Sequence, residues 1–305
     1  KCYGMIKITI TGDFCPIGKI GELSLLKKNE DVLNDFLPIL NESDLAITNL
    51  ECPLINSADA GIKFGPVLRA NISTIDLLKF ANVGLVTLAN NHIMDYGNEG
   101  LDNTIKLCEE KQIACVGAGK TLKEARIPFT KVIKGKKITI FNFAENEFSN
   151  THGDYPGANP LSLASNYNDI KKFKDDSDYI IVIVHGGNEM YQLPSPRFKE
   201  TLMFFADCGA NAVIAHHTHC FSGFETYNGS SIFYGLGNFL FDYNMRNNDL
   251  WNTGLAVQLI LSDTNSFFEL IPFYQNKNTR DGVFLMNENE KKVFKEIWDE
   301  LIPCF

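Results

Sequence analysis

Three histidines stand within four residues in the segment His216-His217-Thr218-His219, directly after an apolar run at 212–215. In extended backbone, side chains two residues apart point to the same side, so His217 and His219 can present both imidazoles to one ion. Imidazole nitrogens are common ligands of divalent transition metals. The spacing therefore predicts a metal site at the end of a strand, against the alternative of histidines that are only structural.

Four other apolar runs also end in polar side chains that suit a metal site or acid–base chemistry. They place Asp13 after 6–10, Glu51 after 45–48, Asn91-His92 after 84–89 and His185 after 179–184. Each of these residues alone can equally be a turn or capping residue. In open α/β folds, however, ligands bind at the carboxyl ends of the strands. Five strands that deliver Asp, Glu, Asn and His to one edge predict a shared metal-binding site there.

Two further groups beside these strand ends can assist chemistry. His92 can donate a proton to a leaving group, and Asp95, three residues further on, can orient its imidazole. The alternative for this segment is a polar turn between a strand and a helix. After His185, Gly186-Gly187 lets a ligand approach the backbone closely, and Glu189 can serve as an acid, a base or a partner of a metal ligand.

Helices and strands that would position these residues alternate along the first two thirds of the chain. Apolar runs and caps predict helices at 31–40, 73–80, 99–111, 161–173 and 195–208, and additional strands at 113–116, 129–133 and 137–143. From residue 221 the pattern is all-β, with strands near 221–226, 231–235, 254–262 and 267–274, before a final helix at 288–301. Residues 145–160 are rich in Asn, Gly and Pro and are predicted to be a long surface loop. The segment 117–121 (GAGKT) is not a P-loop, because Ala114 stands where that motif needs glycine.

The composition of the 305 residues is that of a globular protein, with 45% hydrophobic and 21% charged residues. A net charge of -9 argues against nonspecific binding of nucleic acid. No apolar run reaches the roughly 18–20 residues that a membrane-spanning helix needs. The eight cysteines include no C-x-x-C pair, which favours free thiols in a reducing compartment. We therefore expect a cytoplasmic protein, and the alternative of a signal or membrane anchor removed upstream of Lys1 stays open.

Taken in order, these motifs resemble the bacterial capsule-synthesis protein CapA (poly-γ-glutamate capsule, PGA_cap) family, a branch of the calcineurin-like metallophosphoesterases. The resemblance covers about residues 6–242. It rests on Gly12-Asp13, Asn49-Leu50-Glu51, Leu88-Ala89-Asn90-Asn91-His92, Gly117-Ala118-Gly119, Glu124-Ala125, His185-Gly186, Glu189, Gly209-Ala210, His217-x-His219 and the segment 234–239. The set is specific because so many separate motifs follow one another in the same order.

This resemblance implies an α/β fold of four layers, a metallophosphoesterase-like α-β-β-α sandwich, in a single domain over 1–305 that residues 243–305 complete. It also implies one or two divalent ions, and the ligand types suit Mn, Fe or Zn. In such sites a pair of ions clamps the attacking and leaving oxygens. By motif, Asp13 and His219 would bind the first ion, Asn91, His185 and His217 would bind the second, and Glu51 would bridge both. His92 would protonate the leaving group.

Three departures from the superfamily pattern affect this expectation. Cys15 stands where phosphoesterases of this class usually have histidine, Glu51 replaces their bridging aspartate as in the capsule family, and Thr218 replaces the proline of their H-P-H motif. The resemblance therefore leaves open that one of the two ions is weakly held or that the site is mononuclear. Cys15 is expected to be a small packed residue, with a soft metal ligand as the alternative.

The function implied by the resemblance is metal-dependent hydrolysis of a phosphoester or amide bond in the synthesis of capsule, exopolysaccharide or poly-γ-glutamate. The substrate would be a small molecule or a polymer that is anionic, γ-glutamyl or sugar-like. Glu189 would assist the reaction or hold a metal ligand in place, and Asp95 would orient His92 as its spacing suggests. One alternative is a non-catalytic component that binds or assembles the capsule polymer, and another is a nucleotide phosphatase. Fold alone does not choose among these functions.

Overall fold

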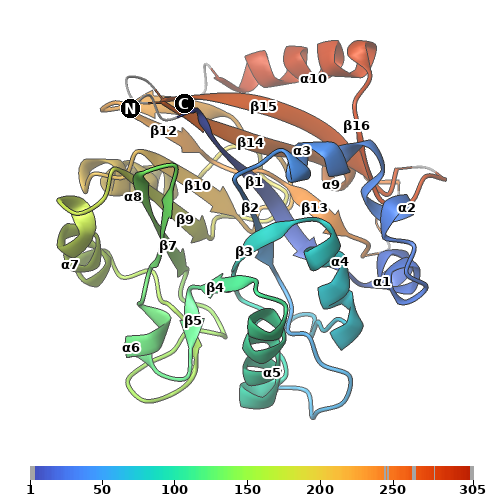
Figure 1. Ribbon diagram of the computed structural model, residues 1–305, viewed down its shortest axis with the longest axis horizontal. Coiled ribbons are helices and arrows are strands. Elements are labelled where there is room, and N and C mark those ends of the chain that lie inside the picture. Colours follow the sequence, from blue (N-terminus) through green and yellow to red (C-terminus); the bar gives the residue numbers. More distant parts are fainter. Residues whose placement is uncertain (1–3, 244, 246, 263–265, 278, 303–305) are drawn as a thin grey trace.

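The computed structural model describes residues 4–243, 245, 247–262, 266–277 and 279–302 (Figure 1). The expectations about cysteines and about an upstream anchor rest partly on residues outside this described part, namely Lys1, Cys2 and Cys304. The described chain forms two large β-sheets that face each other, with helices on their outer sides.

The first sheet has eight strands among the described residues. In order across the sheet lie β16 (Val283–Leu285), β15 (Ser266–Gln275), β14 (Thr253–Leu261), β1 (Ile6–Cys15), β2 (Leu45–Leu50), β3 (Val83–Thr87) and β4 (Ala114–Val116). The remaining strand, β13 (Asn238–Phe241), pairs with the last residues of β1, beyond the part of β1 that pairs with β14. Strands β1 to β4 are parallel, so their carboxyl ends lie at one edge of the sheet.

The second sheet has six strands in the described part of the chain. Their order is β11 (Phe224–Tyr227), β12 (Ser230–Phe233), β10 (Ala212–His216), β9 (Tyr179–His185), β7 (Lys136–Ala144) and β6 (Phe129–Ile133). Strands β7, β9 and β10 are parallel, with His216 opposite His185. The carboxyl ends of β1, β2, β9 and β10 point towards the same side of the molecule (Figure 1). A separate short pair joins β5 (Ala118–Gly119) to β8 (Gly157–Ala158).

The helices form the two outer layers. The first sheet is covered by α1 (Gly18–Leu25), α2 (Asn29–Leu33), η1 (Asn34–Phe36), α3 (Leu37–Asn41), η2 (Ile72–Thr74), α4 (Ile75–Phe80) and α5 (Gly97–Glu110). The second sheet is covered by α7 (Leu163–Lys174) and α8 (Pro196–Asp207). The short helices α6 (Leu122–Ala125) and α9 (Asp249–Asn252) lie beside β5 and β14, and α10 (Glu288–Leu301) packs along the edge of the sandwich.

Alternating side chains of the strands fill the three cores between these layers. Ile8 and Ile10 of β1 meet Ile181 and Ile183 of β9 between the sheets. Neighbouring residues of β9, such as Val182, point the other way and pack under α7 and α8. Because both faces of each central strand are buried, the strands read as continuous apolar runs. The predicted four-layer α-β-β-α sandwich is confirmed.

Several predicted elements have different boundaries in the structure. The predicted helix at 31–40 is divided into α2, η1 and α3, because Asn34 has φ 45°, which a continuous right-handed helix does not accommodate. The helix expected from Ser73 begins earlier, since Asn71 accepts a hydrogen bond from the Ser73 amide at 3.0 Å. Helix α1 was not predicted. Across the described residues, no helix combines the length and the apolar character needed to cross a bilayer.

Candidate metal centre

The six residues predicted as metal ligands lie together, where the carboxyl ends of β1 and β2 in the first sheet meet those of β9 and β10 in the second. Ligand atoms of Asp13, Glu51 and His185 lie within 4.8 Å of one another, and so do those of Glu51, His217 and His219. Asn91 joins this set, because its Oδ1 lies 3.0 Å from Nε2 of His185. Both groups contain Glu51, so its carboxylate lies between two sets of potential ligands.

The carboxylate of Glu51 shows that a cation fits this site. Glu51 is fully buried, and neither of its carboxylate oxygens has a hydrogen-bond partner among the described residues. Burial and the nearby Asp13 carboxylate raise the pKa of Glu51. Nε2 of His185 and Nε2 of His219 lie 3.4 and 3.7 Å from Oε1 of Glu51. Two ligands bound about 2.1 Å from a tetrahedral ion are about 3.4 Å apart, so the spacing suits a divalent ion.

Asp13 is held at the end of β1 by two donors. Its Oδ1 accepts a hydrogen bond from Nδ2 of Asn49 at 2.7 Å, and its Oδ2 accepts one from the backbone amide of His217 at 3.2 Å. Burial opposes ionisation of Asp13, but the hydrogen bond and charge of His219 outweigh it, and the pKa of Asp13 is lowered. Asp13 is therefore a carboxylate at neutral pH, as a metal ligand must be.

Asn49 is a residue to which sequence reasoning gave no role, although it stands in one of the motifs quoted above. Besides binding Asp13, its Nδ2 lies 3.2 Å from Nδ1 of His185. Its Oδ1 accepts a hydrogen bond from Nδ2 of Asn90 at 3.2 Å. Groups that hold the far side of a metal ligand fix its orientation. Asn49 therefore joins ligands from both sheets, and its only sequence signal was its position two residues before Glu51.

Asn238 was also missed, and it holds a ligand from the other side of the site. Its Oδ1 lies 2.9 Å from Nδ1 of His219, which leaves Nε2 of that imidazole facing Glu51. The chain approaches β1 closely here, since a Cβ atom on Gly12 would lie 1.8 Å from the carbonyl oxygen of Gly237. The Gly237-Asn238 motif thus packs against Gly12 and positions His219.

His92 and Asp95 are in contact, as the sequence suggested. Nδ1 of His92 lies 2.7 Å from Oδ2 of Asp95, and the same oxygen accepts a hydrogen bond from the backbone amide of Leu68 at 2.6 Å. Burial lowers the pKa of His92, although Asp95 acts in the opposite direction. Lys63, which no sequence signal singled out, contacts both residues.

Glu189 lies in an exposed turn after β9. Its charge acts on Glu51, His217 and His219 and favours a raised pKa in each of them. A carboxylate that was missed contacts one of the proposed ligands, since Oε1 of Glu147 is 3.7 Å from Nε2 of His217. Glu145 accepts a hydrogen bond from the amide of Gly187 at 2.7 Å. Both glutamates belong to the predicted surface loop, where the sequence pattern gave no reason to expect a contact with the site.

Cys15 is fully buried in the core under the first helical layer, beside Cys52, and belongs to neither group of potential ligands. Burial raises the pKa of its thiol. A metal ligand is the thiolate rather than the thiol. The burial of Cys15 and its absence from both groups of potential ligands fit the expected small packed residue. The six cysteines in the described part of the chain are all free.

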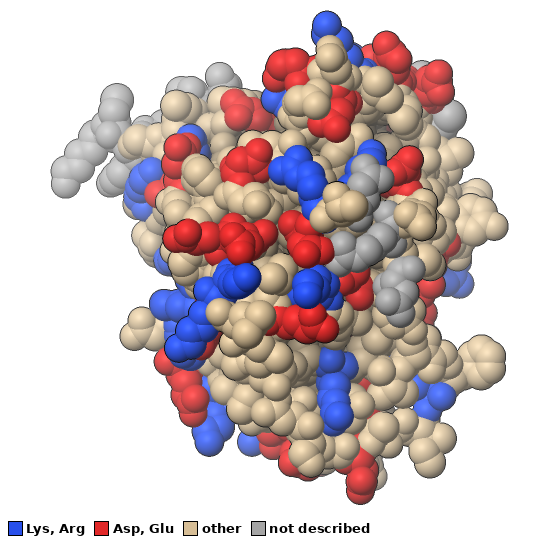
Figure 2. Space-filling view, turned by 90° about the vertical axis from the view of Figure 1, so that its right-hand side faces the viewer, with Lys and Arg blue, Asp and Glu red and all other residues tan. Residues whose placement is uncertain are grey.

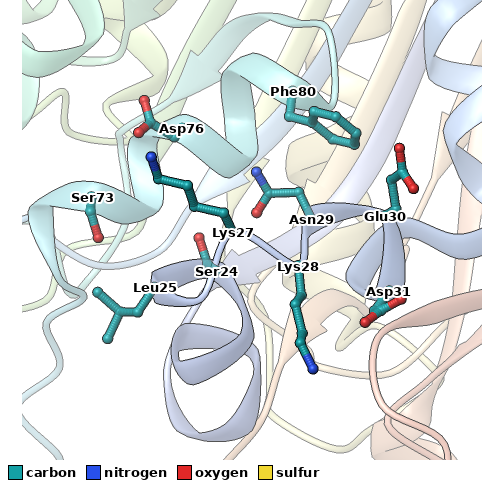
Figure 3. Close-up of a pocket in the computed structure, with 10 residues that line it drawn as sticks. All are labelled: Ser24, Leu25, Lys27, Lys28, Asn29, Glu30, Asp31, Ser73, Asp76 and Phe80. Atoms are coloured by element: carbon teal, nitrogen blue, oxygen red, sulfur yellow. The ribbon is translucent and has the colours of Figure 1, made fainter.

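A separate hollow of about 550 Å³ lies between the turn that joins α1 to α2 and helix α4 (Figure 3). Lys27, Lys28, Asp76 and Phe80 are among its lining residues, and none of the predicted site residues lines it. On the face seen from the right of Figure 1, acidic and basic side chains of the described residues are interspersed (Figure 2). That face offers no broad basic surface within the described chain.

Comparison with known proteins adds family information to this geometry. The model of a family described as "Bacterial capsule synthesis protein PGA_cap" matches residues 7–243. The chain is 29% identical over 250 residues to the capsule biosynthesis protein CapA of Bacillus anthracis, covering 78% of this chain and 60% of that protein. It is 27% identical over 307 residues to the PGA biosynthesis protein CapA of Bacillus subtilis (strain 168), covering 96% of this chain and 78% of that protein.

The chain spans about 60% of the length of the Bacillus anthracis relative. A probable polyglutamine synthesis accessory protein of Mycobacterium tuberculosis is 24% identical over 214 residues, which cover 66% of this chain and 56% of that protein. Among solved structures, the protein TT1561 of Thermus thermophilus is similar with a TM-score of 0.44 and 9% identity, over 87% of this chain and 99% of that chain.

Proposed function

Because the chain belongs to the bacterial capsule synthesis protein PGA_cap family, we propose that it is a metal-dependent hydrolase in the synthesis of a capsule or poly-γ-glutamate polymer. The buried carboxylate of Glu51, shared by two groups of potential ligands and without a hydrogen-bond partner among the described residues, carries this proposal. The printed names of the two Bacillus relatives support the polymer context. The bond cleaved is a phosphoester or an amide in an anionic, γ-glutamyl or sugar-like substrate.

The proposed ligand set divides between two ions, of which Mn, Fe or Zn suit the nitrogen and oxygen donors. The first would be held by Asp13 and His219, whose Oδ2 and Nδ1 lie 3.4 Å apart. The second would be held by Asn91, His185 and His217, where Nε2 of His185 lies 3.0 Å from Oδ1 of Asn91 and 3.1 Å from Nδ1 of His217. Glu51 would bind both, and the two groups of neighbouring ligand atoms around Glu51 cut across this division, since one contains Asp13 with His185 and the other His217 with His219. When bound, divalent ions supply polarisation of the scissile group and activation of water. Asn49 and Asn238 orient the ligands before an ion arrives.

His92 is the proposed proton donor to the leaving group. Asp95 holds the Nδ1 side of its ring, so the Nε2 side is the one left to carry the transferred proton. Glu189 is proposed as an assisting acid or base that approaches from the exposed turn after β9. None of these three residues is needed to hold an ion in this scheme, so metal content and proton transfer can be tested separately.

The experiment that tests the proposal combines metal analysis with a substrate panel. We expect purified protein to contain a transition metal, and to hydrolyse one member of a panel of phosphodiesters and γ-glutamyl peptides. His217→Ala should lower both metal content and turnover. His152→Ala removes an exposed histidine outside the ligand set and is the matched control. Wild-type protein without bound transition metal, and with unchanged behaviour after His217→Ala, would contradict the proposal.

A non-catalytic polymer-binding or assembly role is the second candidate. It is favoured by Cys15, which takes the place of a usual ligand and belongs to neither ligand group. With one ligand fewer, an ion can be bound without supporting turnover. In the same experiment, this role predicts bound metal and binding of poly-γ-glutamate but no hydrolysis of any substrate in the panel.

We also propose that residues 1–305 form a single domain. Strands β14 and β15, from the last fifth of the chain, pair in the same sheet as β1. Side chains of α10 contribute to the core between the sheets, including Phe294 and Trp298. Truncation before β14 is therefore expected to prevent folding, which circular dichroism of the truncated chain would test.

A further inference from the structure

The segment 56–69, which joins β2 to η2 without regular structure, carries a charged side chain inwards. The side chain of Lys63 is only 7% exposed, whereas its neighbours Ile62 and Phe64 are almost completely exposed. Apolar side chains are usually buried and lysine is usually exposed, and lysine is rarely buried unless it is paired. Burial of an ammonium group is costly without hydrogen-bonding partners. The groups that surround Lys63 must therefore compensate for its burial.

Those partners are the side chains of His92 and Asp95 and the backbone carbonyl of Asn91. Nζ of Lys63 forms an ion pair with Oδ1 of Asp95, donates to the carbonyl oxygen of Asn91 at 3.1 Å, and lies 3.0 Å from Nδ1 of His92. The other carboxylate oxygen of Asp95, Oδ2, contacts Nδ1 of His92. One buried carboxylate thus joins the lysine to the imidazole.

The same segment is attached to Asp95 on both sides of Lys63. The amide of Gly61 donates to the carbonyl oxygen of Asp95 at 2.7 Å, and the amide of Leu68 donates to its Oδ2 at 2.6 Å. Lys63 also lies over the ring of Phe148, with 5.6 Å between Nζ and the ring centroid. The ammonium of Lys63 thus lies between the turn 91–95 and the ring of Phe148, and these contacts leave it little room to reach a substrate.

We propose that Lys63 is a positioning residue for His92. Its ammonium holds Oδ1 of Asp95, so that Oδ2 stays against Nδ1 of the imidazole, and it anchors the segment 56–69 beside the site. The inference rests on the proposed function only in taking His92 as the proton donor. The coupling of Lys63 to His92 through Asp95 can be measured without any substrate.

The test uses Lys63→Met, which keeps the length of the side chain and removes its charge. Imidazole nitrogen resonances of the full chain are recorded by long-range proton–nitrogen correlation, with Lys131→Met as the control at an exposed lysine. We expect the His92 resonances to shift and those of His152 to stay unchanged. We also expect faster cleavage by chymotrypsin after Phe64. Unchanged His92 resonances in folded Lys63→Met protein would overturn the inference.

A second pair of variants removes the risk that an unpaired Asp95 prevents folding. Lys63→Met is introduced into Asp95→Asn protein, which has no buried carboxylate at this position. Because Nζ of Lys63 also lies 3.0 Å from Nδ1 of His92, its removal moves the His92 resonances to some extent even without the carboxylate. If Lys63 acts mainly through Asp95, Lys63→Met moves the His92 resonances less in Asp95→Asn protein than in wild type, because coupled residues are not additive. A shift of the same size in both backgrounds overturns the inference.

Activity measurements separate this inference from the proposed function. If wild-type protein hydrolyses a substrate, Lys63→Met should lower kcat by about tenfold or more with KM little changed, since general acid catalysis contributes about 10²–10⁴-fold. If wild-type protein shows no turnover but the resonances respond as expected, the proposed function fails and the positioning role stands. Normal kcat in Lys63→Met protein overturns the positioning role alone.

Discussion

Nδ2 of Asn49 donates a 2.7 Å hydrogen bond to Oδ1 of Asp13, and both side chains are fully buried. The two residues stand opposite each other on the parallel strands β1 and β2. Because the amide also lies 3.2 Å from Nδ1 of His185, it connects a carboxylate of the first sheet to an imidazole of the second. Asn49 therefore aligns two proposed ligands that come from distant parts of the sequence.

Replacing Asn49 by alanine is expected to weaken metal binding. Loss of a group that holds metal ligands costs about 10- to 100-fold in affinity, and leaving buried polar partners unsatisfied costs about 1–3 kcal/mol of stability. Titration of metal-free protein with Zn²⁺ measures the first effect and urea unfolding the second. Asn41→Ala, at the exposed end of α3, is the control. Equal zinc affinity in Asn49→Ala and wild-type protein would count against this role.

Glu51→Gln is expected to change stability in opposite directions with and without metal. The buried carboxylate lacks a hydrogen-bond partner among the described residues, so a neutral amide should stabilise metal-free protein by about 1 kcal/mol or more. The variant should also lose the stabilisation by metal, which is about 2.7 kcal/mol at 100 times Kd. Urea unfolding with chelator and with added Zn²⁺ measures both. A variant that metal stabilises as strongly as wild type would show that Glu51 is not a ligand.

The meeting of the strand ends was predictable from the residues because it follows from a simple pattern. Buried parallel strands appear as apolar runs, and the first polar residue after each run marks the edge where ligands bind. His185 was singled out in this way, and His217 by its spacing from His219. The family resemblance supplied the four layers, which the structure confirms, and a division of the ligands between two ions, which stays a prediction.

The contacts that orient the ligands were less predictable because they depend on side chains from unrelated segments. Asn238 contacts His219 across 19 residues, and Lys63 contacts His92 across 29 residues. Neither contact follows from the periodicity of a helix or a strand. Glu147 is a similar case. It lies in a loop rich in Asn and Gly, which has no helix or strand periodicity, so the sequence does not indicate which of its side chains point towards the site.

Cys15→Ala is expected to leave the metal stoichiometry unchanged. Cys15 lies in the core beneath the helices, and its thiol belongs to neither group of potential ligands, so we expect it to contribute packing rather than a ligand. The lost sulfur should cost about 1 kcal/mol of stability, as most single substitutions do. Metal analysis after dialysis and urea unfolding measure these two effects, with Cys208→Ala as the control in the opposite outer core. Loss of one ion per chain from Cys15→Ala alone would identify Cys15 as a ligand.

The role of His92 as proton donor predicts an effect that depends on the leaving group. In His92→Gln protein, hydrolysis of an alkyl ester or amide should fall by about 100-fold or more, because its leaving group needs a proton. A p-nitrophenyl substrate should be affected much less, since p-nitrophenolate leaves without protonation. Asp95→Asn, which removes the charge beside Nδ1 of His92, should give the same dependence at smaller magnitude. Steady-state kinetics with a matched pair of substrates measures both variants. An equal loss for the two leaving groups, with metal content unchanged, would mean that His92 supports binding or folding rather than proton transfer.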